Sequence, residues 1–175
     1  MSTTNRDRGL CDECGRALDP RRATLIDGKP VCENCLHGDS EPVTIRPIGL
    51  VVNDKKSAKK GFGITGGDLS EIHLYPGIAR LMKGVDEESH LTIVWLLHET
   101  RSVETEFARG WDGKLVGPFA SRTPHRLTPI AITDVELVEV KGTTLVVRGL
   151  DAENGTAVLD IKVGLQSLRD RGSRP

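Results

Sequence analysis

Four cysteines stand close together near the start of the chain: Cys11, Cys14, Cys32 and Cys35. They form two C-x2-C pairs separated by 17 residues, a spacing within the range of sites in which four thiolates bind one zinc ion. Gly15 follows the first pair and suits the positive φ angle of a tight turn around the sulfurs. The alternatives are a pair of redox C-x-x-C motifs, or thiols without a function.

The residues around these cysteines predict a small module that depends on its metal. Residues 23–32, "ATLIDGKPVC", are expected to form a hairpin that turns at Asp27-Gly28 and brings the second pair beside the first. A segment this short lies below the roughly 40 residues that usually fold on an apolar core alone. Because four thiolates leave no open coordination position, we interpret the zinc as structural, in a module that resembles a zinc ribbon or treble clef.

A second group of chemically capable residues lies in "GPFASRTPHRLTPIAITD", residues 117–134. Pro124 and Pro129 restrict the backbone, so this segment has less entropy to lose when a ligand binds. The guanidinium of Arg122 can pair with a carboxylate through two parallel hydrogen bonds. Taken alone, however, an arginine in a loop is more often a solvated surface charge.

The composition limits the classes of partner. There are 24 Lys and Arg residues against 25 Asp and Glu residues, so the chain lacks the broad positive field of many nucleic-acid-binding proteins. Aromatic residues make up 3%, which argues against stacking of many unpaired bases. An RNA partner would need a local basic site. No apolar run is long enough for a membrane span and no apolar signal segment is seen, so we expect a cytoplasmic protein without membrane contact. The local basic candidates are Arg16, Arg21, Arg22 and Lys29.

Strands are the main elements that must position these groups. Short β-branched runs separated by turns predict a mainly β fold, a closed β-barrel or strongly curled sheet, with one short helix at 76–85. We expect a zinc module at 1–40, a barrel domain at 41–168 and a flexible tail at 169–175. The predicted strands are residues 43–52, 71–75, 91–98, 131–140, 143–150 and 156–163.

One glycine-rich stretch imitates a nucleotide-binding motif. "GFGITG", residues 61–66, satisfies G-x-G-x-x-G, but it follows the lysine-rich "NDKKSAKK" and no helix pattern follows it. It therefore fails as a Rossmann fingerprint. A glycine loop that closes backbone amides over a ligand, or one that binds nothing, remains open.

Five sequence blocks together resemble the TrmO family, methyltransferases that use S-adenosylmethionine to modify N6-threonylcarbamoyladenosine in tRNA. Family members read "PIGVV", "KFGIPRQ", "FWFH", "FATRSPHRPNPIGLS" and "DGTPVLDIKPY" in this order. The present chain reads "PIGLVV" from residue 47, "GFGITGG" from 61, "VWLLHE" from 94, "FASRTPHRLTPIAIT" from 119 and "NGTAVLDIKVG" from 154. The resemblance runs from about Ile45 to Lys162.

The resemblance implies a barrel that forms a homodimer, binds S-adenosylmethionine partly through the dimer interface and methylates N6 of threonylcarbamoyladenosine beside the tRNA anticodon. It implies that Arg122 grips the carboxylate of the cofactor and that Ile132 supplies an apolar wall. Asp160, Glu99 or His98 would accept the proton from the acceptor nitrogen. The positions that match the family's cofactor contacts are Thr65, Gly66, Gly67, His98, Glu99, Arg122, Ile132, Glu153, Asn154, Gly155 and Thr156.

Departures from the family pattern keep two alternatives open. The "PRQ" of the family is "TGG" here, and the "FWFH" strand has lost aromatic residues to "WLLH". A pocket changed in this way would suit another methyl acceptor, such as a different RNA site, a protein or a small molecule. The other alternative is a catalytically silent, zinc-bearing adaptor that binds RNA or nucleotide-like ligands.

Overall fold

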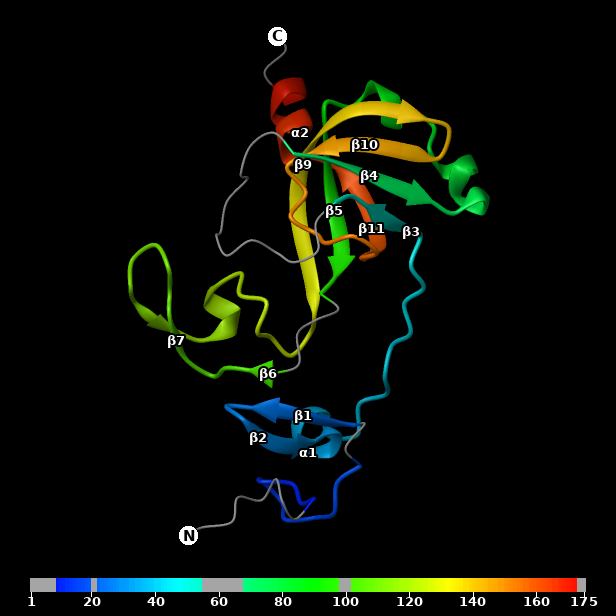
Figure 1. Ribbon diagram of the computed structural model, residues 1–175. Coiled ribbons are helices and arrows are strands. Elements are labelled where there is room, and N and C mark those ends of the chain that lie inside the picture. The colour runs from blue at the N-terminus through cyan, green and yellow to red at the C-terminus, as the bar shows by residue number, and fades with distance from the viewer. Residues whose placement is uncertain (1–8, 20–21, 55–67, 98–101, 173–175) are drawn as a thin grey trace. The chain divides into compact units, whose positions relative to one another are not determined.

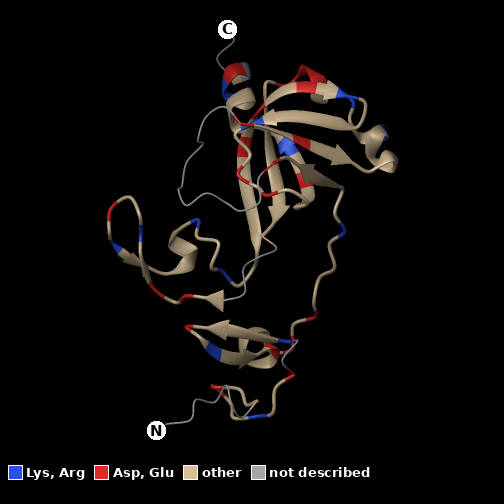
Figure 2. Cartoon of the chain, viewed as in Figure 1, with Lys and Arg blue, Asp and Glu red and all other residues tan. Residues whose placement is uncertain are grey.

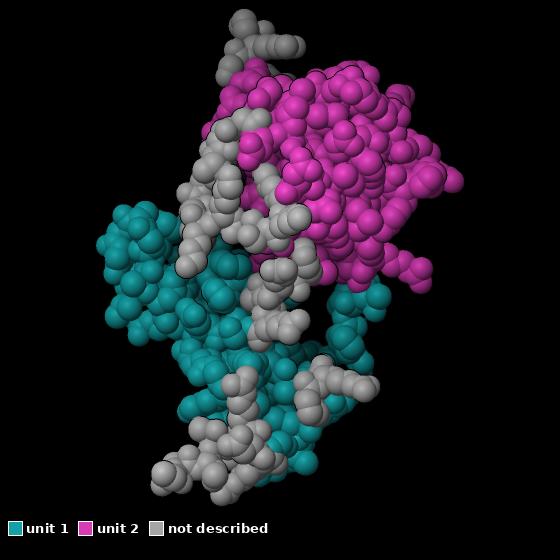
Figure 3. Space-filling model, viewed as in Figure 1, with its two compact units in different colours: residues 1–44, 99–129 teal, residues 45–98, 130–175 magenta. Residues whose placement is uncertain are grey.

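A computed structural model divides the chain into two compact units (Figure 3). Residues 1–44 and 99–129 form the first, called here the cysteine unit, and residues 45–98 and 130–175 form the second, called the barrel unit. The structure describes residues 9–19, 22–54, 68–97 and 102–172.

Six antiparallel strands close into a barrel (Figure 1). Their order around the barrel is β10-β4-β3-β11-β5-β9, and the pairing of β9 with β10 closes the ring. Closure leaves no unpaired strand edge. This confirms the predicted mainly β fold and all six predicted strands. The strands are β3 (Gly49–Val52), β4 (Leu69–Leu74), β5 (His90–Leu96), β9 (Ile130–Lys141), β10 (Thr144–Arg148) and β11 (Ala157–Val163).

The apolar core of the barrel follows largely from alternation along β3, β4 and β5, whereas three successive residues of β10 are buried. In β4 every second residue is buried, and in β5 the buried positions are Leu91, Ile93 and Trp95. Because side chains of a strand point alternately to its two faces, this pattern directs one face of each strand inward. The inner faces of β4, β5 and their neighbours then share one hydrophobic core, which includes Ile72 and Leu145 at 0% exposure.

The helices differ from the prediction. Residues 76–85 do not form one α-helix but lie largely in two short 3-10 helices, η2 (Pro76–Leu81) and η3 (Val85–Glu87). Pro76 begins the first as expected, but the run is too short to sustain α-helical bonding. At the other end, α2 (Leu165–Gly172) was not predicted and covers the first part of the expected flexible tail.

The cysteine unit joins two separate stretches of chain. The first stretch contains the hairpin of β1 (Ala23–Ile26) and β2 (Lys29–Cys32), followed by α1 (Glu33–His37). The second stretch, residues 102–129, contains β6 (Ser102–Val103), β7 (Phe107–Ala108), β8 (Leu115–Val116) and the 3-10 helix η4 (Pro118–Ala120). Strand β6 adds to the hairpin and gives a three-stranded sheet in the order β2-β1-β6.

The predicted domain ranges 1–40 and 41–168 therefore do not follow the compact units, because residues 99–129 group with the cysteines and not with the barrel. No helix in the described part of the chain combines the length and the apolar character needed to cross a bilayer.

Candidate functional site

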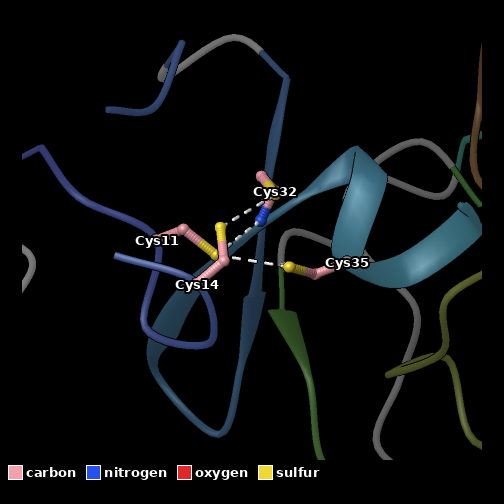
Figure 4. Close-up of side chains that lie close together, drawn as sticks. All are labelled: Cys11, Cys14, Cys32 and Cys35. Carbon is pink, nitrogen blue, oxygen red and sulfur yellow. Dashed lines mark hydrogen bonds between the residues drawn. The ribbon is translucent and has the colours of Figure 1, made fainter. Parts of the chain in front are cut away.

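The four cysteine sulfurs form one cluster (Figure 4). All four Sγ atoms lie within 4.8 Å of one another, and the Cys11–Cys35 and Cys14–Cys32 pairs are each 3.9 Å apart. None of the four is in a disulfide. The fold thus brings together all the residues that the sequence predicts as metal ligands.

Two local structures deliver these cysteines. Residues 11–16 form a tight turn in which the Gly15 N–H donates to the carbonyl of Cys11 at 2.9 Å, and Gly15 has the predicted positive φ of 69°. The hairpin turns at Asp27 and Gly28, with φ angles of 48° and 77°, as a two-residue turn between twisted strands requires. Cys32 then ends β2, and α1 carries Cys35 back toward the first pair.

Hydrogen bonding makes the thiols of Cys11 and Cys35 unequal in pKa. The backbone N–H of Cys14, with further N–H donors, lowers the pKa of Cys11 to about 6 despite its burial. The pKa of Cys35 is raised to about 12, chiefly because its thiol is hydrogen-bonded with the side chains of Cys32 and Cys14. One thiolate therefore forms readily, while additional negative charge in the cluster needs a cation to balance it.

This donor set fits a tetrahedral zinc ion. Zinc–sulfur bonds of about 2.3 Å place tetrahedral thiolates roughly 3.8 Å apart, which is close to the 3.9 Å separations of the Cys11–Cys35 and Cys14–Cys32 sulfurs. Soft thiolate donors favour zinc over magnesium or calcium. The Cys32 N–H also donates to Cys11 Sγ at 3.4 Å, as backbone groups do around a metal-bound sulfur.

In the barrel unit, the predicted cofactor contacts that the structure describes, Ile132 and Glu153–Thr156, lie toward one end of the barrel. Because the strands alternate in direction, the ends of β3, β5 and β10 and the starts of β4, β9 and β11 all lie at the same rim. We call this end the contact rim. Ile132 lies near the start of β9 and is 55% exposed. Glu153 to Thr156 directly precede β11.

The Glu153–Thr156 turn is held firmly at the contact rim. Thr156 is 1% exposed, and its carbonyl accepts a hydrogen bond from Val51 N–H at 2.9 Å. The Gly155 N–H donates to the Val51 carbonyl at 2.8 Å, and Gly155 has a φ of 80°, which favours glycine. The side-chain oxygen of Asn154 accepts from Asn53 N–H at 3.1 Å. The turn therefore presents Asn154 and Gly155 at the surface in a fixed conformation.

A hydrogen-bond relay at this rim, which runs from a buried indole to a surface carboxylate, was not predicted from the sequence. The Trp95 indole N–H donates to Thr133 Oγ1 at 3.1 Å, and the Thr133 hydroxyl donates to Asp151 at 2.6 Å. Trp95 is 6% exposed, whereas Asp151 lies at the surface. Cross-strand pairing of Trp95 with Ala131 places these strands side by side. Only the tryptophan, a buried donor that needs an acceptor, could have signalled the relay.

In the cysteine unit, Arg122 lies in a loop that local hydrogen bonds stiffen. The Ser121 N–H donates to the carbonyl of Pro118 at 3.2 Å, and the Thr123 N–H donates to Ser121 Oγ at the same distance. Thr123 is 5% exposed, whereas Arg122 itself is exposed. Local geometry thus supports the predicted rigidity of the loop, and Arg122 is accessible.

Several predicted residues lie outside the described residues: Thr65, Gly66, Gly67, His98, Glu99 and Arg21. Of the candidate proton acceptors, only Asp160 is described. It lies within β11 next to a register shift, and it forms a 2.6 Å ion pair with Lys162. Positive and negative residues are interspersed in both units (Figure 2). Arg22 and Lys29 pair with Glu33 and Asp12, which weakens both as phosphate contacts, and Arg16 is exposed.

Comparison with known proteins decides the family. The sequence matches the tRNA-methyltransferase O N-terminal domain over residues 54–168. The chain belongs to this family. Membership in the TrmO family confirms the predicted resemblance and the predicted enzyme class, a methyltransferase that uses S-adenosylmethionine.

Individual relatives and a solved structure agree with this assignment. A probable S-adenosyl-L-methionine-binding protein of Methanothermobacter thermautotrophicus is 37% identical over 133 residues, which cover 74% of this chain and 96% of that protein. The mouse tRNA (adenine(37)-N6)-methyltransferase is 32% identical over 84 residues, or 46% of this chain and 20% of the mouse protein. A crystal structure of TrmO has a TM-score of 0.59 at 22% identity, covering 71% of this chain and 58% of that chain. The last likeness confirms the fold, and this chain spans little more than half of that TrmO chain.

Proposed function

We propose that this chain transfers the methyl group of S-adenosylmethionine to N6 of threonylcarbamoyladenosine beside the tRNA anticodon. The observation that carries the proposal is the TrmO family match over residues 54–168, which includes the strands of the contact rim other than β3. The mouse relative is named for methylation at N6 of adenine 37 in tRNA, which supports this choice of acceptor.

The contact rim suits a ligand that must be held without much rearrangement. The turn at Glu153–Thr156 is already fixed by the backbone of β3, so little ordering entropy remains to be lost on binding. Asn154 offers an amide, Gly155 allows close backbone approach, and Ile132 supplies an exposed apolar surface. We propose that these residues and Arg122 contact the cofactor, together with Thr65–Gly67, His98 and Glu99.

The chemical step itself needs few catalytic groups from the protein. The sulfonium of the cofactor activates its methyl group, so the site must align the acceptor nitrogen and exclude water. As the nitrogen–carbon bond forms, the sulfur–carbon bond breaks and the N6 proton leaves. His98, Glu99 and Asp160 are the proposed acceptors of that proton. The ion pair of Asp160 with Lys162 occupies the carboxylate, so it must open before Asp160 can accept the proton.

The cysteines are proposed to hold a structural zinc ion, and a homodimer is proposed because the family resemblance implies it. The zinc proposal is supported by the 3.9 Å sulfur separations and by four thiols outside any disulfide. Metal analysis of the purified chain tests it, with one zinc per chain as the expected result. Size-exclusion chromatography with light scattering tests the dimer.

Binding of the cofactor is tested first, by calorimetry on the purified chain. We expect Arg122→Gln to weaken S-adenosylmethionine binding by roughly tenfold or more, since a charged hydrogen bond contributes about 1.5–3 kcal/mol. Arg126→Gln is the matched control, because Arg126 lies in the same loop. Equal affinities of the wild type and Arg122→Gln would remove Arg122 from the site.

The acceptor is tested by mass spectrometry of tRNA nucleosides from a strain that lacks the gene. Loss of N6-methylated threonylcarbamoyladenosine, with restoration by the wild-type gene, is the expected result. An unchanged amount of this nucleoside would exclude this acceptor and favour another methyl acceptor. The "TGG" at residues 65–67 and the missing aromatic residues after Trp95 support that alternative. Formation of S-adenosylhomocysteine with bulk RNA then separates an enzyme with another RNA acceptor from a silent adaptor.

A further inference from the structure

The first stretch of the cysteine unit, residues 1–44, is called here the cysteine module. It is hydrogen-bonded to the chain segment that follows barrel strand β5. Strand β6 pairs in parallel with β1, with Leu25 opposite Ser102 and Ile26 opposite Val103. The Asp27 N–H extends this pairing by donating to the Val103 carbonyl at 2.8 Å. A segment that belongs to the TrmO match thereby becomes the third strand of the cysteine module's sheet.

The carboxylate of Asp27 completes the connection. One oxygen accepts from the Thr105 N–H at 2.9 Å, and the other accepts from the Thr105 hydroxyl at 2.5 Å. These two bonds lower the pKa of Asp27, so the carboxylate stays ionised at neutral pH. Asp27 holds this position because it occupies the hairpin turn with a φ of 48°. The turn of the cysteine module thus binds Thr105 through both carboxylate oxygens of Asp27.

Apolar residues of both stretches also lie at this junction. They line a shared pocket of about 610 Å³. Val31 and Val103, one from each stretch, are 4% and 8% exposed. The apolar lining consists of Ile26, Val31, Leu36, Val103, Pro118, Phe119 and Leu127.

From Thr105 the contacts continue to the loop that carries Arg122. A Cβ atom on Gly117 would lie 3.2 Å from the Thr105 carbonyl, so the two backbones pack closely. Gly117 caps η4, and its carbonyl accepts from Ala120 N–H at 3.1 Å. The next residues of the loop, Ser121 and Thr123, are held by the hydrogen bonds from their backbone N–H groups to Pro118 and Ser121. Each step from Asp27 to Arg122 is a contact within the cysteine unit.

We propose that metal binding by the four cysteines orders the Arg122 loop through the contact between Asp27 and Thr105, and thereby strengthens cofactor binding. The metal fixes the β1–β2 hairpin, whose turn holds Thr105, and Thr105 supports the start of the loop. Asp27 acts here as a positioning residue. The second half of the proposal rests on the proposed cofactor-binding role of Arg122. Linkage of this kind is reciprocal, so the cofactor must also strengthen metal binding by the same factor.

Hydrogen exchange on the full chain tests the first half without any cofactor. Removing the metal with a chelator should lower the protection of amides in 102–106 and 117–126, most directly that of the Thr105 N–H, while the barrel amides keep theirs. Asp27→Gly and Thr105→Val should have the same effect with the metal still bound. Glycine tolerates the positive φ at residue 27, and valine keeps the shape of threonine. Arg22→Gln, which breaks an exposed ion pair inside the module, is the control and should change neither segment.

Calorimetry tests the second half. Metal removal, Asp27→Gly and Thr105→Val should each weaken S-adenosylmethionine binding by roughly tenfold, within the usual range of coupling between sites. The cofactor should tighten zinc binding of the wild type, but not of Asp27→Gly, by the same factor.

The ordering of the loop and its effect on cofactor binding can be disproved separately. Unchanged exchange in residues 102–126 after metal removal, or in metal-loaded Asp27→Gly, would overturn the proposed ordering. Suppose that the metal protects these amides from exchange, but that the metal-loaded wild type does not bind S-adenosylmethionine. That result would instead overturn the proposed role of Arg122. Equal cofactor affinities of the loaded wild type and Asp27→Gly would disprove the linkage.

Discussion

The two compact units maintain their folds by different means. The barrel unit buries a continuous set of aliphatic side chains from all six strands, with Val51, Ile72 and Ile93 at 0% exposure. Among the described residues of the cysteine unit, the buried apolar side chains are only Cys11, Pro30, Val31 and Val103. Since burial contributes about 25 cal/mol per Å², the barrel can be stable on its core, whereas the cysteine unit has a small apolar core and is expected to depend on its hydrogen bonds and on the proposed metal.

The largest effect should come from breaking the metal cluster. Cys14→Ser removes one of four thiolates from a site worth on the order of 10 kcal/mol. Because Cys14 is exposed, the substitution buries no new polar group. We expect loss of bound zinc and of hydrogen-exchange protection throughout the cysteine unit, with the barrel retained. Full zinc content in this variant would show that three cysteines suffice.

A smaller effect, confined to the other unit, should follow from a cavity in the barrel. Leu145→Ala removes a fully buried side chain, and such changes cost about 2–5 kcal/mol. Urea unfolding followed by tryptophan fluorescence measures the loss, and zinc content should stay at the wild-type level. Val138→Ala on the same sheet is the control, because Val138 is 41% exposed and its truncation should change stability by less than about 0.5 kcal/mol. A fall in zinc content with Leu145→Ala would mean that the units are not independent.

Backbone crowding gives a third test of the barrel. A Cβ atom at Gly49 would lie 2.5 Å from the His73 carbonyl oxygen and 2.9 Å from the Leu74 Cα, so β3 and β4 would have to separate. We expect Gly49→Ala to cost about 1–3 kcal/mol by overpacking, as measured by thermal unfolding. Gly77→Ala meets no atom within 4 Å and is the matched control. Equal melting temperatures for the two variants would contradict the tight approach of β3 to β4.

The smallest effect should come from surface charge. Arg148 and Glu136 form a 2.9 Å ion pair across β10 and β9, with side chains 41% and 51% exposed. Exposed pairs of this kind contribute about 0–1 kcal/mol. Arg148→Gln should therefore leave the unfolding midpoint of the barrel almost unchanged. A loss as large as that of Leu145→Ala would show that this surface ion pair contributes as much stability as a buried core side chain.

The barrel could be predicted from the sequence because its information is local. Strands β3, β4 and β5 each carry their own alternation, and Gly142 stands at the hairpin between β9 and β10. The predicted strands 131–140 and 143–150 place that turn at Lys141-Gly142, whereas it lies one residue later, at Gly142 and Thr143, because Lys141 still pairs with Thr144. The four metal ligands were equally readable, because their spacing alone carries the signal.

The grouping of residues 99–129 with the cysteines could not be predicted, because it depends on contacts between distant segments. Strand β6 has only two residues and acquires its partner from β1, far earlier in the chain. Helix α2 was missed for a related reason. Its sequence is mostly polar, and tertiary contacts anchor it: Ser167 is 4% exposed and accepts from His90 N–H at 2.9 Å. Gly164, just before the helix, packs directly on the backbone of His90.

Strands β5 and β9 pair from His90–Glu136 to Leu96–Ile130, so residues 97–129 leave the barrel and return to it at adjacent positions. The ladder already holds both ends of this insertion together, so its length and content add little to the entropy of closing the barrel. An insertion held in this way can be lengthened or shortened while the barrel keeps its strand register. The insertion in this chain supplies β6 to the sheet of the N-terminal hairpin, and a short Asn-Gly turn grafted between Leu96 and Ile130 would yield a minimal barrel for design.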